Sequence, residues 1–384
     1  MEELGERAVK QALKLGASEA EAYIRKARVT RVEFAEEIET IKVSESIGVN
    51  VRVALGRRVA SHSTSILSED EIVETAAQAV RIARVAPEDP DWRHLNRRFG
   101  AGLAEGYFDP AVRDLHPPEI VEALTPALDA MKGYDRRVKP TRGVLVVTAS
   151  ATSVTNSYGE HCLREGTYVS VWMRAKAEEA GLKGTGTEHQ QSRFWREVDL
   201  EGLALKAAER AVKFLRAKPI PSGRMPTILA NKVFASILGV LLSGPVSADW
   251  VQKGRSPLAG RLGAQIASKA VCIVDDGTLR GGWGTKPFDD EGHPTQRTIL
   301  VDRGILQGYL YDTYTSLKAG VDSTGNAQRP RYWMRPRPLP NNLILEAGDA
   351  SSEEMIRETG RGLYVEDTIG EWLSNPVSGL LNAT

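Results

Sequence analysis

The sequence predicts an α+β fold in which two units of sheet and helix are followed by a strand-rich mixed domain. Two segments, residues 21–64 and 143–181, alternate apolar and polar side chains with a period of two, and an amphipathic helix follows each. The last third of the chain includes a predicted hairpin around Gly304. Its strand and helix patterns do not alternate regularly, which favours α+β over a wound parallel sheet. At about 150 residues per domain, the 384 residues provide for two or three domains.

The first unit begins with a helix over residues 2–15, where apolar side chains recur at helical spacing and Gly16 ends the helix. Strands follow over residues 21–64, with a hairpin turn at Gly56. A capping box at Ser68, completed by a glutamate three residues later, starts a second amphipathic helix. We expect an antiparallel sheet with one polar face.

The second unit begins with a helix over residues 118–132 and ends with a helix that Asp199 caps. The sequence of its last helix, `AAERAVKFLRAKP`, is similar to `AAQAVRIARVAP` in the first unit. This similarity suggests a structural duplication, although any two units of sheet and helix share such a pattern. We therefore divide the chain into an N-terminal α+β domain (1–88), a linker (89–117), a central α+β domain (118–218) and a strand-rich C-terminal domain (219–384).

Composition restricts the function classes. The formal net charge is zero, so no overall field attracts nucleic acid or anionic membrane. Cys162 and Cys272 form no `CxxC` pair, which fits a reducing compartment. The N-terminus lacks the apolar core of a signal peptide, and the longest apolar run, residues 233–244, is shorter than the roughly 20 residues of a membrane span. These features predict a cytoplasmic protein with no membrane association.

The stretch `VDDGTLRGGWGTKPFDDEGHP`, residues 274–294, combines acidic pairs, glycines and a histidine. The six histidines of the chain are each more than twenty residues apart, which excludes a helical zinc motif. Adjacent acids at the end of a strand point to opposite sides, and the calcium-loop spacing is absent. We assign no metal to the stretch and expect its carboxylates to cap turns.

Other catalytic and binding patterns are weak. The glycines of `GTLRGGWGTKP` do not form the `GxxxxGK[ST]` arrangement, since Pro287 follows Lys286. The motif `GxSxG` is absent, and Cys162 and His161 face opposite sides of a strand. The segment 328–342 combines four arginines with Tyr332 and Trp333. Such a segment suits either base stacking with phosphate contacts or an extended wall that holds carboxylates, including a peptide C-terminus.

Three motifs resemble the TldD/PmbA family: the stretch from `VDDGTLRGGWGTKPFDDEGHP` to `YDTYTSLKAG`, the later `STGNAQR` and the earlier `SESIGVNVRV`. The resemblance runs from about residue 5 to residue 384. Members of the family, long called modulators of DNA gyrase, are understood as zinc metallopeptidases, and two subunit types pair. The catalytic type carries `HExxxH` on the helix upstream of `DDGT`, with a cysteine near the C-terminus completing the site.

The corresponding helix here reads `GVLLSGPVSADW`, with Ser243, Gly244 and Ala248 at the positions of the motif. The chain is therefore similar to the PmbA type, also called TldE. The resemblance implies a non-catalytic subunit without cofactor or catalytic residue, which helps to form a groove for unfolded or peptide substrate. Zinc is expected only in a TldD-like partner, and a homodimer is expected when the chain is alone. Because relatives continue past `NPVSGLLNAT`, we also expect a shortened C-terminal domain.

The resemblance also implies which residues shape the substrate groove. They are Asp275, Asp276, Gly277, Asp289, Asp290, Glu291, Gly325 and Asn326. Two alternatives remain: an independent hydrolase that uses the acidic residues or His293, and a DNA- or gyrase-associated binding protein that uses the arginine-rich segment. The zero net charge disfavours nucleic acid.

Overall fold

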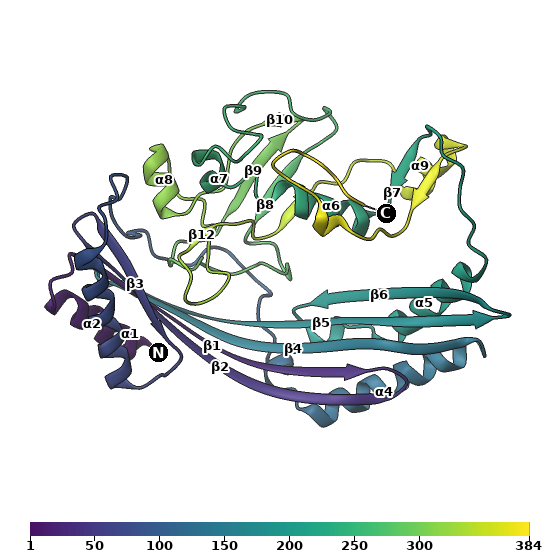
Figure 1. The fold of residues 1–384 in the computed structure, drawn as a ribbon, viewed down its shortest axis with the longest axis horizontal. Helices are drawn as coiled ribbons and strands as arrows, with labels where there is room; N and C mark the ends of the chain where they lie inside the picture. The colour runs from purple at the N-terminus through teal and green to yellow at the C-terminus, as the bar shows by residue number, and fades with distance from the viewer. Residues whose placement is uncertain (384) are drawn as a thin grey trace.

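The computed structural model describes residues 1–383, and its main feature is a long curved antiparallel sheet (Figure 1). The sheet has six strands in the order β3-β2-β1-β4-β5-β6. They are β1 (Glu19–Phe34), β2 (Ile38–Leu55), β3 (Arg58–Thr64), β4 (Val138–Asn156), β5 (His161–Glu179) and β6 (Leu182–Ser192). The predicted α+β class is confirmed.

The two predicted units share this one sheet. Strand β1 pairs with β4 in a register that runs from Glu21 opposite Asn156 to Phe34 opposite Gly143. The pairing joins segments more than one hundred residues apart, so no local sequence pattern indicates it. The curved sheet is therefore a platform built jointly by both units.

Helices cover one face of the sheet. They are α1 (Glu2–Lys14), α2 (Glu69–Val85), α4 (Pro117–Tyr134) and α5 (Leu200–Lys213), and the short α3 (Pro110–Asp114) lies inside the predicted linker. Helices α1 and α2 bury Ala22 and Ile24 of β1 at one end, and α4 and α5 bury Val32 and Phe34 at the other. All four residues have even numbers, so both helix pairs pack on the same face, and the odd-numbered residues of β1 point to the opposite face.

The helix caps follow the sequence closely. Asp199 Oδ1 accepts a hydrogen bond from Gly202 N at 2.8 Å, as predicted. Ser68 Oγ accepts one from Glu71 N at 3.3 Å. The expected capping box at Ser68 is only half formed, because the Glu71 carboxylate accepts instead from the Thr64 hydroxyl at 3.1 Å.

Strand β6 was not predicted from the sequence, because its glycines and polar residues lack strand propensity. The glycines have a packing reason. A Cβ atom at Gly184 would lie 2.0 Å from Ala211 O, and one at Gly186 would lie 2.1 Å from Ala207 O. Both glycines thus let helix α5 lie directly on the edge strand.

The C-terminal module, residues 227–383, lies over the other, concave face of the sheet (Figure 1). Its central sheet has the order β10-β9-β8-β13, and the predicted hairpin around Gly304 is present as β9 and β10. The strands are β7 (Thr227–Leu229), β8 (Ile273–Asp276), β9 (Arg297–Asp302), β10 (Ile305–Leu306), β11 (Ala327–Gln328), β12 (Arg337–Pro338), β13 (Leu343–Leu345) and β14 (Leu363–Val365). The helices are α6 (Asn231–Leu242), α7 (Ala248–Gln252), α8 (Thr313–Ala319) and α9 (Ser352–Thr359).

One helix prediction needs correction. The sequence suggested a single helix through `GVLLSGPVSADW`, but α6 ends at Leu242 and α7 begins at Ala248. Pro245 explains the break, since a proline lacks the amide hydrogen that would continue the helix. Across residues 1–383, every helix is too short or too polar to cross a bilayer.

Candidate functional site

The predicted acidic residues lie where the C-terminal module meets the curved sheet. We call residues Phe288–His293 the acidic loop. Asp289 holds this loop in shape, because its Oδ1 accepts hydrogen bonds from Glu291 N at 2.9 Å and His293 N at 3.0 Å. Its Oδ2 accepts from Ala327 N at 3.0 Å. Burial and the neighbouring Glu291 raise the pKa of Asp289 well above its ordinary value.

Asp290 and Glu291 connect the acidic loop to other elements. Asp290 accepts from Arg329 N at 2.7 Å and pairs with the Arg164 guanidinium of β5 at 2.5 Å. Burial alone would raise the pKa of Asp290, but Arg164 and Lys286 lower it to about 2. Glu291 accepts from Arg52 of β2 at 2.8 Å and from Thr313 N at 3.0 Å, where α8 begins.

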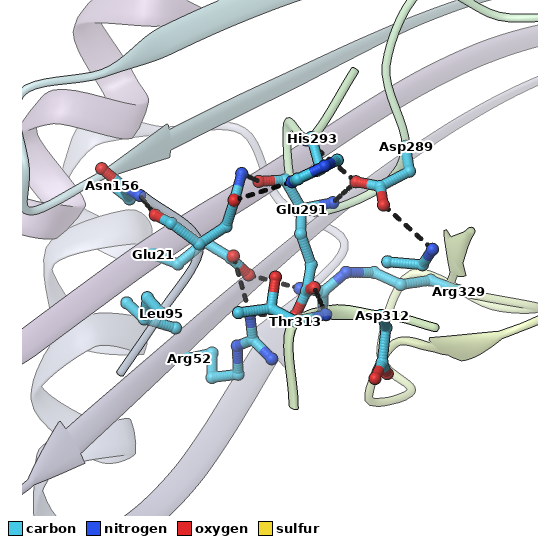
Figure 2. A network of polar contacts seen from close by, with 12 residues as sticks. Glu21, Arg52, Leu95, Asn156, Asp289, Glu291, His293, Asp312, Thr313 and Arg329 are labelled. Atoms are coloured by element: carbon cyan, nitrogen blue, oxygen red, sulfur yellow. Dashed lines mark hydrogen bonds and ion pairs between the residues drawn. The ribbon is translucent and has the colours of Figure 1, made fainter. Parts of the chain in front are cut away.

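Four buried side chains form an ion network beneath the loop (Figure 2). They are Glu21, Arg52, Glu291 and Arg329. Arg52 Nη2 lies 2.8 Å from both Glu21 and Glu291, and the Arg329 guanidinium pairs with the other oxygen of Glu21. None of the four side chains is more than 6% exposed. Two cations thus alternate with two anions, which is the arrangement a dry interior requires.

The predicted linker closes the network on one side. Asn96 Nδ2 donates to Glu291 O at 2.9 Å, and Asn156 Nδ2 of β4 donates to Asn96 O at 2.7 Å. His293 Nδ1 lies 3.3 Å from Asn96 Oδ1. Burial and Arg98 lower the pKa of His293, so the ring is neutral near pH 7. The linker is therefore part of the interface between sheet and C-terminal module.

The remaining predicted residues form a second group around Asp275. Asp275 Oδ2 accepts from Asn326 Nδ2 at 2.7 Å, and burial raises the pKa of Asp275 to about 6. Asp276 Oδ1 accepts from Thr278 N at 2.8 Å in the following turn. A Cβ atom at Gly277 would lie 2.6 Å from Thr295 Cβ, and Gly325 has a φ of 70°, so both positions favour glycine.

The segment Gly325–Arg329 joins the two groups. Three of its residues, Asn326, Ala327 and Arg329, donate hydrogen bonds to Asp275, Asp289 and Asp290 respectively. All of the predicted groove residues except Asp276 are buried, and the oxygens of Asp289 and Asp290 already accept hydrogen bonds. The independent hydrolase would need accessible carboxylates, and this pair is not accessible. The acidic residues hold the surrounding loops in place through these hydrogen bonds.

The side chains at the zinc-motif positions do not fit a zinc ion. Ser243 Oγ donates to Gly239 O at 2.6 Å, the aromatic ring of Trp250 packs against Gly244, and the methyl group of Ala248 is buried. Zinc sites in proteins use imidazole, thiolate or carboxylate ligands. Throughout residues 1–383, no three histidine, cysteine, aspartate or glutamate side chains are grouped to hold a metal ion.

A cavity of about 500 Å³ lies beside α7. Trp92, Trp250, Tyr314 and Met334 give it an aromatic and apolar part, and Asp249 and Asp312 lie at its wall. It is thus next to the position where the resemblance places the zinc of the catalytic type. A mixed apolar and polar cavity of this size suits one or two side chains of a peptide.

Two of the four arginines in the segment 328–342 contact other parts of the chain. Arg329 is buried in the ion network and stacks 4.8 Å from the Tyr23 ring centre, and Arg335 donates to Val59 O at 3.2 Å. Cys162 packs with Tyr23 and Phe288, and burial raises the pKa of its thiol to about 12. Cys162 is therefore a core residue whose thiol stays protonated.

Sequence reasoning missed the polar residues outside the C-terminal module that line its interface with the curved sheet. They are Glu21, Arg25, Asn50, Arg52, Asn96, Arg164 and Arg193. The available signal was the presence of charged residues at some of the odd-numbered positions of a strand, such as Glu21 and Arg25 of β1. We interpreted such positions as a solvent-exposed face, whereas the C-terminal module covers them.

The chain thus has a three-part architecture, with a curved sheet, a helical layer and a C-terminal module. Sequence profiles of PmbA/TldA metallopeptidase domain 1, the central domain and the C-terminal domain match residues 20–83, 110–215 and 222–384. The chain belongs to the PmbA/TldA metallopeptidase family, which confirms the family expected from the motifs.

Individual relatives agree. Metalloprotease MJ0996 of Methanocaldococcus jannaschii is 26% identical over 338 residues, which cover 87% of this chain and 74% of that protein. Metalloprotease PmbA of Escherichia coli O157:H7 is 26% identical over 377 residues, covering 96% of this chain and 81% of that protein. A TldD homolog of Haemophilus influenzae is 34% identical over 190 residues, but these cover only 48% of this chain and 39% of that protein.

Solved structures share the fold. The crystal structure of TldE from Thermococcus kodakarensis aligns with a TM-score of 0.89 at 21% identity, covering 96% of this chain and 83% of that one. A Thermotoga maritima protein described as a candidate modulator of a DNA gyrase aligns with a TM-score of 0.87 at 23% identity, covering 98% and 84%. At these identities the likeness supports the fold alone.

Proposed function

We propose that this chain is a non-catalytic PmbA/TldE-like subunit that builds part of a peptide groove for a zinc-bearing, TldD-like partner in the cytoplasm. The observation that carries the proposal is the set of side chains at the motif positions. Ser243, Gly244 and Ala248 supply a bonded hydroxyl, no side chain and a methyl group. None of these can ligate zinc or act as a general base in peptide hydrolysis.

The cavity beside α7 supports a role in substrate binding. Its aromatic lining lies next to the positions that correspond to the zinc motif, where a peptide side chain could bind close to a metal held by the partner. Unfolded peptides bind extended, with main-chain hydrogen bonds to a strand edge and side chains in pockets. Strand β12 offers such an edge, since its Arg337 lines this cavity and, within the described residues, the strand pairs only with β11.

The test is to purify the chain alone, the TldD-like subunit from the same source alone, and the two together. We expect the isolated chain to carry no stoichiometric zinc and to hydrolyse no unfolded protein, and the complex to be the active species. Metal analysis that finds about one zinc per isolated chain, or hydrolysis by the chain alone, would overturn the proposal.

A variant in the cavity tests the groove itself. Trp250→Ala removes one aromatic wall and is expected to raise the KM of the complex for an unfolded protein, with the zinc content unchanged. Trp195→Ala is a control on the helix-covered face, where Trp195 packs against the core of α4 and α5. An unchanged KM in Trp250→Ala would show that substrate does not use this cavity.

A further inference from the structure

A second cavity, of about 310 Å³, lies between the curved sheet and the acidic loop, and its lining is rich in cations. Strands β1, β4 and β5 form one wall through alternate residues, because only every second side chain of a strand faces the C-terminal module. Arg25, Thr152 and Arg164 lie side by side across these three strands in register. Lys286 faces them from the C-terminal module, so cations line both walls.

The charges in this cavity do not balance. Five cationic residues line it, and only Glu165 and Asp290 are acidic. Glu165 is exposed, while Asp290 already pairs with Arg164, and Arg329 already pairs with Glu21. Arg25, Arg193 and Lys286 therefore have no carboxylate partner within residues 1–383.

Arg193 is the clearest case, because it is 1% exposed. Its five hydrogen bonds go only to main-chain carbonyls, those of Gly282, Tyr107, Thr167, Trp283 and Thr285. The carbonyl dipoles satisfy its donors but leave its full positive charge in place. The guanidinium carbon lies 3.9 Å from the centre of the Tyr168 ring, which forms part of the cavity wall.

Lys286 adds a second unpaired cation. Its amine donates to no acceptor in the part of the chain that the structure describes, and Pro287 follows it, which restricts the backbone at this position. Burial and the neighbouring Arg164 lower the pKa of Lys286 below its ordinary value, although Asp290 opposes this. Burial alone would raise the pKa of Tyr168, but Arg193, Arg164, Lys286 and Arg25 together lower it, as expected in a positive field.

Neutral hydrogen-bonding groups complete the lining. Ser150 and Thr152 contribute hydroxyls, and Gln328 and Asn341 contribute amides. Trp283 is partly exposed and meets Tyr168 edge to face at a centroid distance of 5.0 Å. Cations together with neutral donors suit the several oxygens of a carboxylate or phosphate group.

We propose that this cationic cavity is a binding site for a small anionic group, a carboxylate or a phosphate, held by Lys286, Arg25 and Arg164. A buried cation without a partner destabilises a fold unless a ligand compensates it. Three cations without a carboxylate partner line this one cavity: Arg193, which is fully buried, and Arg25 and Lys286, which are partly buried. They indicate a site shaped for an anion that the chain itself does not supply. The site is separate from the cavity beside α7 and does not depend on a partner subunit.

The two sources of such a group are a free anion and the end of a peptide, and titration calorimetry of the isolated chain at low ionic strength distinguishes them. The probes are inorganic phosphate, N-acetyl-dialanine with its free carboxylate, and N-acetyl-dialanine amide, which is neutral. We expect at least one of the two anions to bind and the amide not to bind. Binding of phosphate alone assigns a free anion, and binding of the acetylated dipeptide assigns a peptide end.

Variants locate the site. Lys286→Met and Arg25→Met are each expected to weaken the bound anion about tenfold or more, because each removes one charge-assisted contact. Lys206→Met is the control and is expected to bind the anion as tightly as the wild type. Lys206 is exposed on α5, a helix on the opposite face of the sheet from the cavity. Two results would overturn the proposal. One is that neither anion binds at concentrations up to about 10 mM, which is tenfold above the Kd of about 1 mM of a weak site. The other is that the affinity is unchanged in both Lys286→Met and Arg25→Met.

Discussion

The ion network and the cationic cavity lie next to each other in the same interface, but the cations of the network have carboxylate partners and several cations of the cavity do not. In the network, Arg52 and Arg329 each contact a carboxylate of Glu21 or Glu291. In the cavity, Lys286 has no such contact, although Asp290 is close enough to influence its pKa. The difference teaches that buried charge alone does not mark a binding site. The net charge of the neighbouring side chains makes the distinction. Where it is zero, as in the ion network, the charges hold the protein together, and where it is positive, as in the cavity, an anionic ligand can bind.

The largest expected effect is at Arg52. Arg52→Met keeps most of the apolar stem but leaves Glu21 and Glu291 without their shared cation in a dry interior. Removing one partner of a buried ion pair typically costs about 3–5 kcal/mol, and urea unfolding measures the loss. The control is Arg81→Met, which breaks a surface pair with Glu74 in which both side chains are 54% exposed, and it should cost less than about 1 kcal/mol. Equal stability of the two variants would contradict a structural role for the network.

The next effect is at Gly48, where the C-terminal module touches β2. The Tyr332 ring lies so close that a Cβ atom at position 48 would be 2.2 Å from its Cγ. We expect Gly48→Ala to destabilise the protein by about 2–3 kcal/mol, since overpacking forces neighbours to move. Adding Tyr332→Ala removes the clash, so the double variant should be more stable than the sum of the two single variants predicts. Strict additivity would mean that the ring and the strand do not meet in solution.

Gly48 also shows what the sequence can and cannot predict. The glycine was visible within `SESIGVNVRV`, one of the motifs that carried the family resemblance, but its reason lies in Tyr332, nearly three hundred residues later. Local features such as the Asp199 cap and the hairpin at Gly304 were predicted, because neighbouring residues determine them. The β1–β4 pairing was not, because it depends on packing between distant segments.

In the candidate site, too, the features determined by neighbouring residues were predicted and those determined by distant segments were not. The acidic and glycine residues of the loop were recognised as a group, and turn formation explains much of their pattern. Their partners, Arg52, Arg164 and Asn96, could not be predicted, since a charged residue on a strand has the same local signature whether water or another module covers it. Lys286 was noticed only because Pro287 excluded a phosphate-loop motif.

A smaller effect is expected from the pH response of Asp312. Burial and Glu291 raise the pKa of Asp312 to about 7, against about 3.9 in an unfolded chain. The folded protein therefore holds a proton that the unfolded chain releases, so this group contributes stability at acidic pH that is lost as pH rises towards 7 and above. Asp312→Asn keeps the oxygen that accepts from Thr315 N at 2.8 Å at the start of α8.

Between pH 5 and pH 8 we expect the wild type to lose about 2–3 kcal/mol of stability that Asp312→Asn does not lose, since the loss runs over about two pH units at about 1.4 kcal/mol each. Urea unfolding at a series of pH values measures the difference. Asp322→Asn, which changes an exposed acid nearby in the sequence, is the control and should follow the wild type. Parallel pH curves for Asp312→Asn and the wild type would show that Asp312 is ionised throughout this range.

The smallest effect, and the sharpest contrast with Arg52, is expected at Lys286 in the absence of ligand. Lys286→Met removes a largely buried cation that no carboxylate neutralises, so the lost charge relieves repulsion from Arg164 instead of stranding an anion. Its unfolding free energy should lie within about 1 kcal/mol of the wild type or above it, even though Arg52→Met removes one buried charge of the same sign. If Lys286→Met were as unstable as Arg52→Met, Lys286 would stabilise the fold as the residues of the ion network do. The contrast between the ion network and the cationic cavity would then fail.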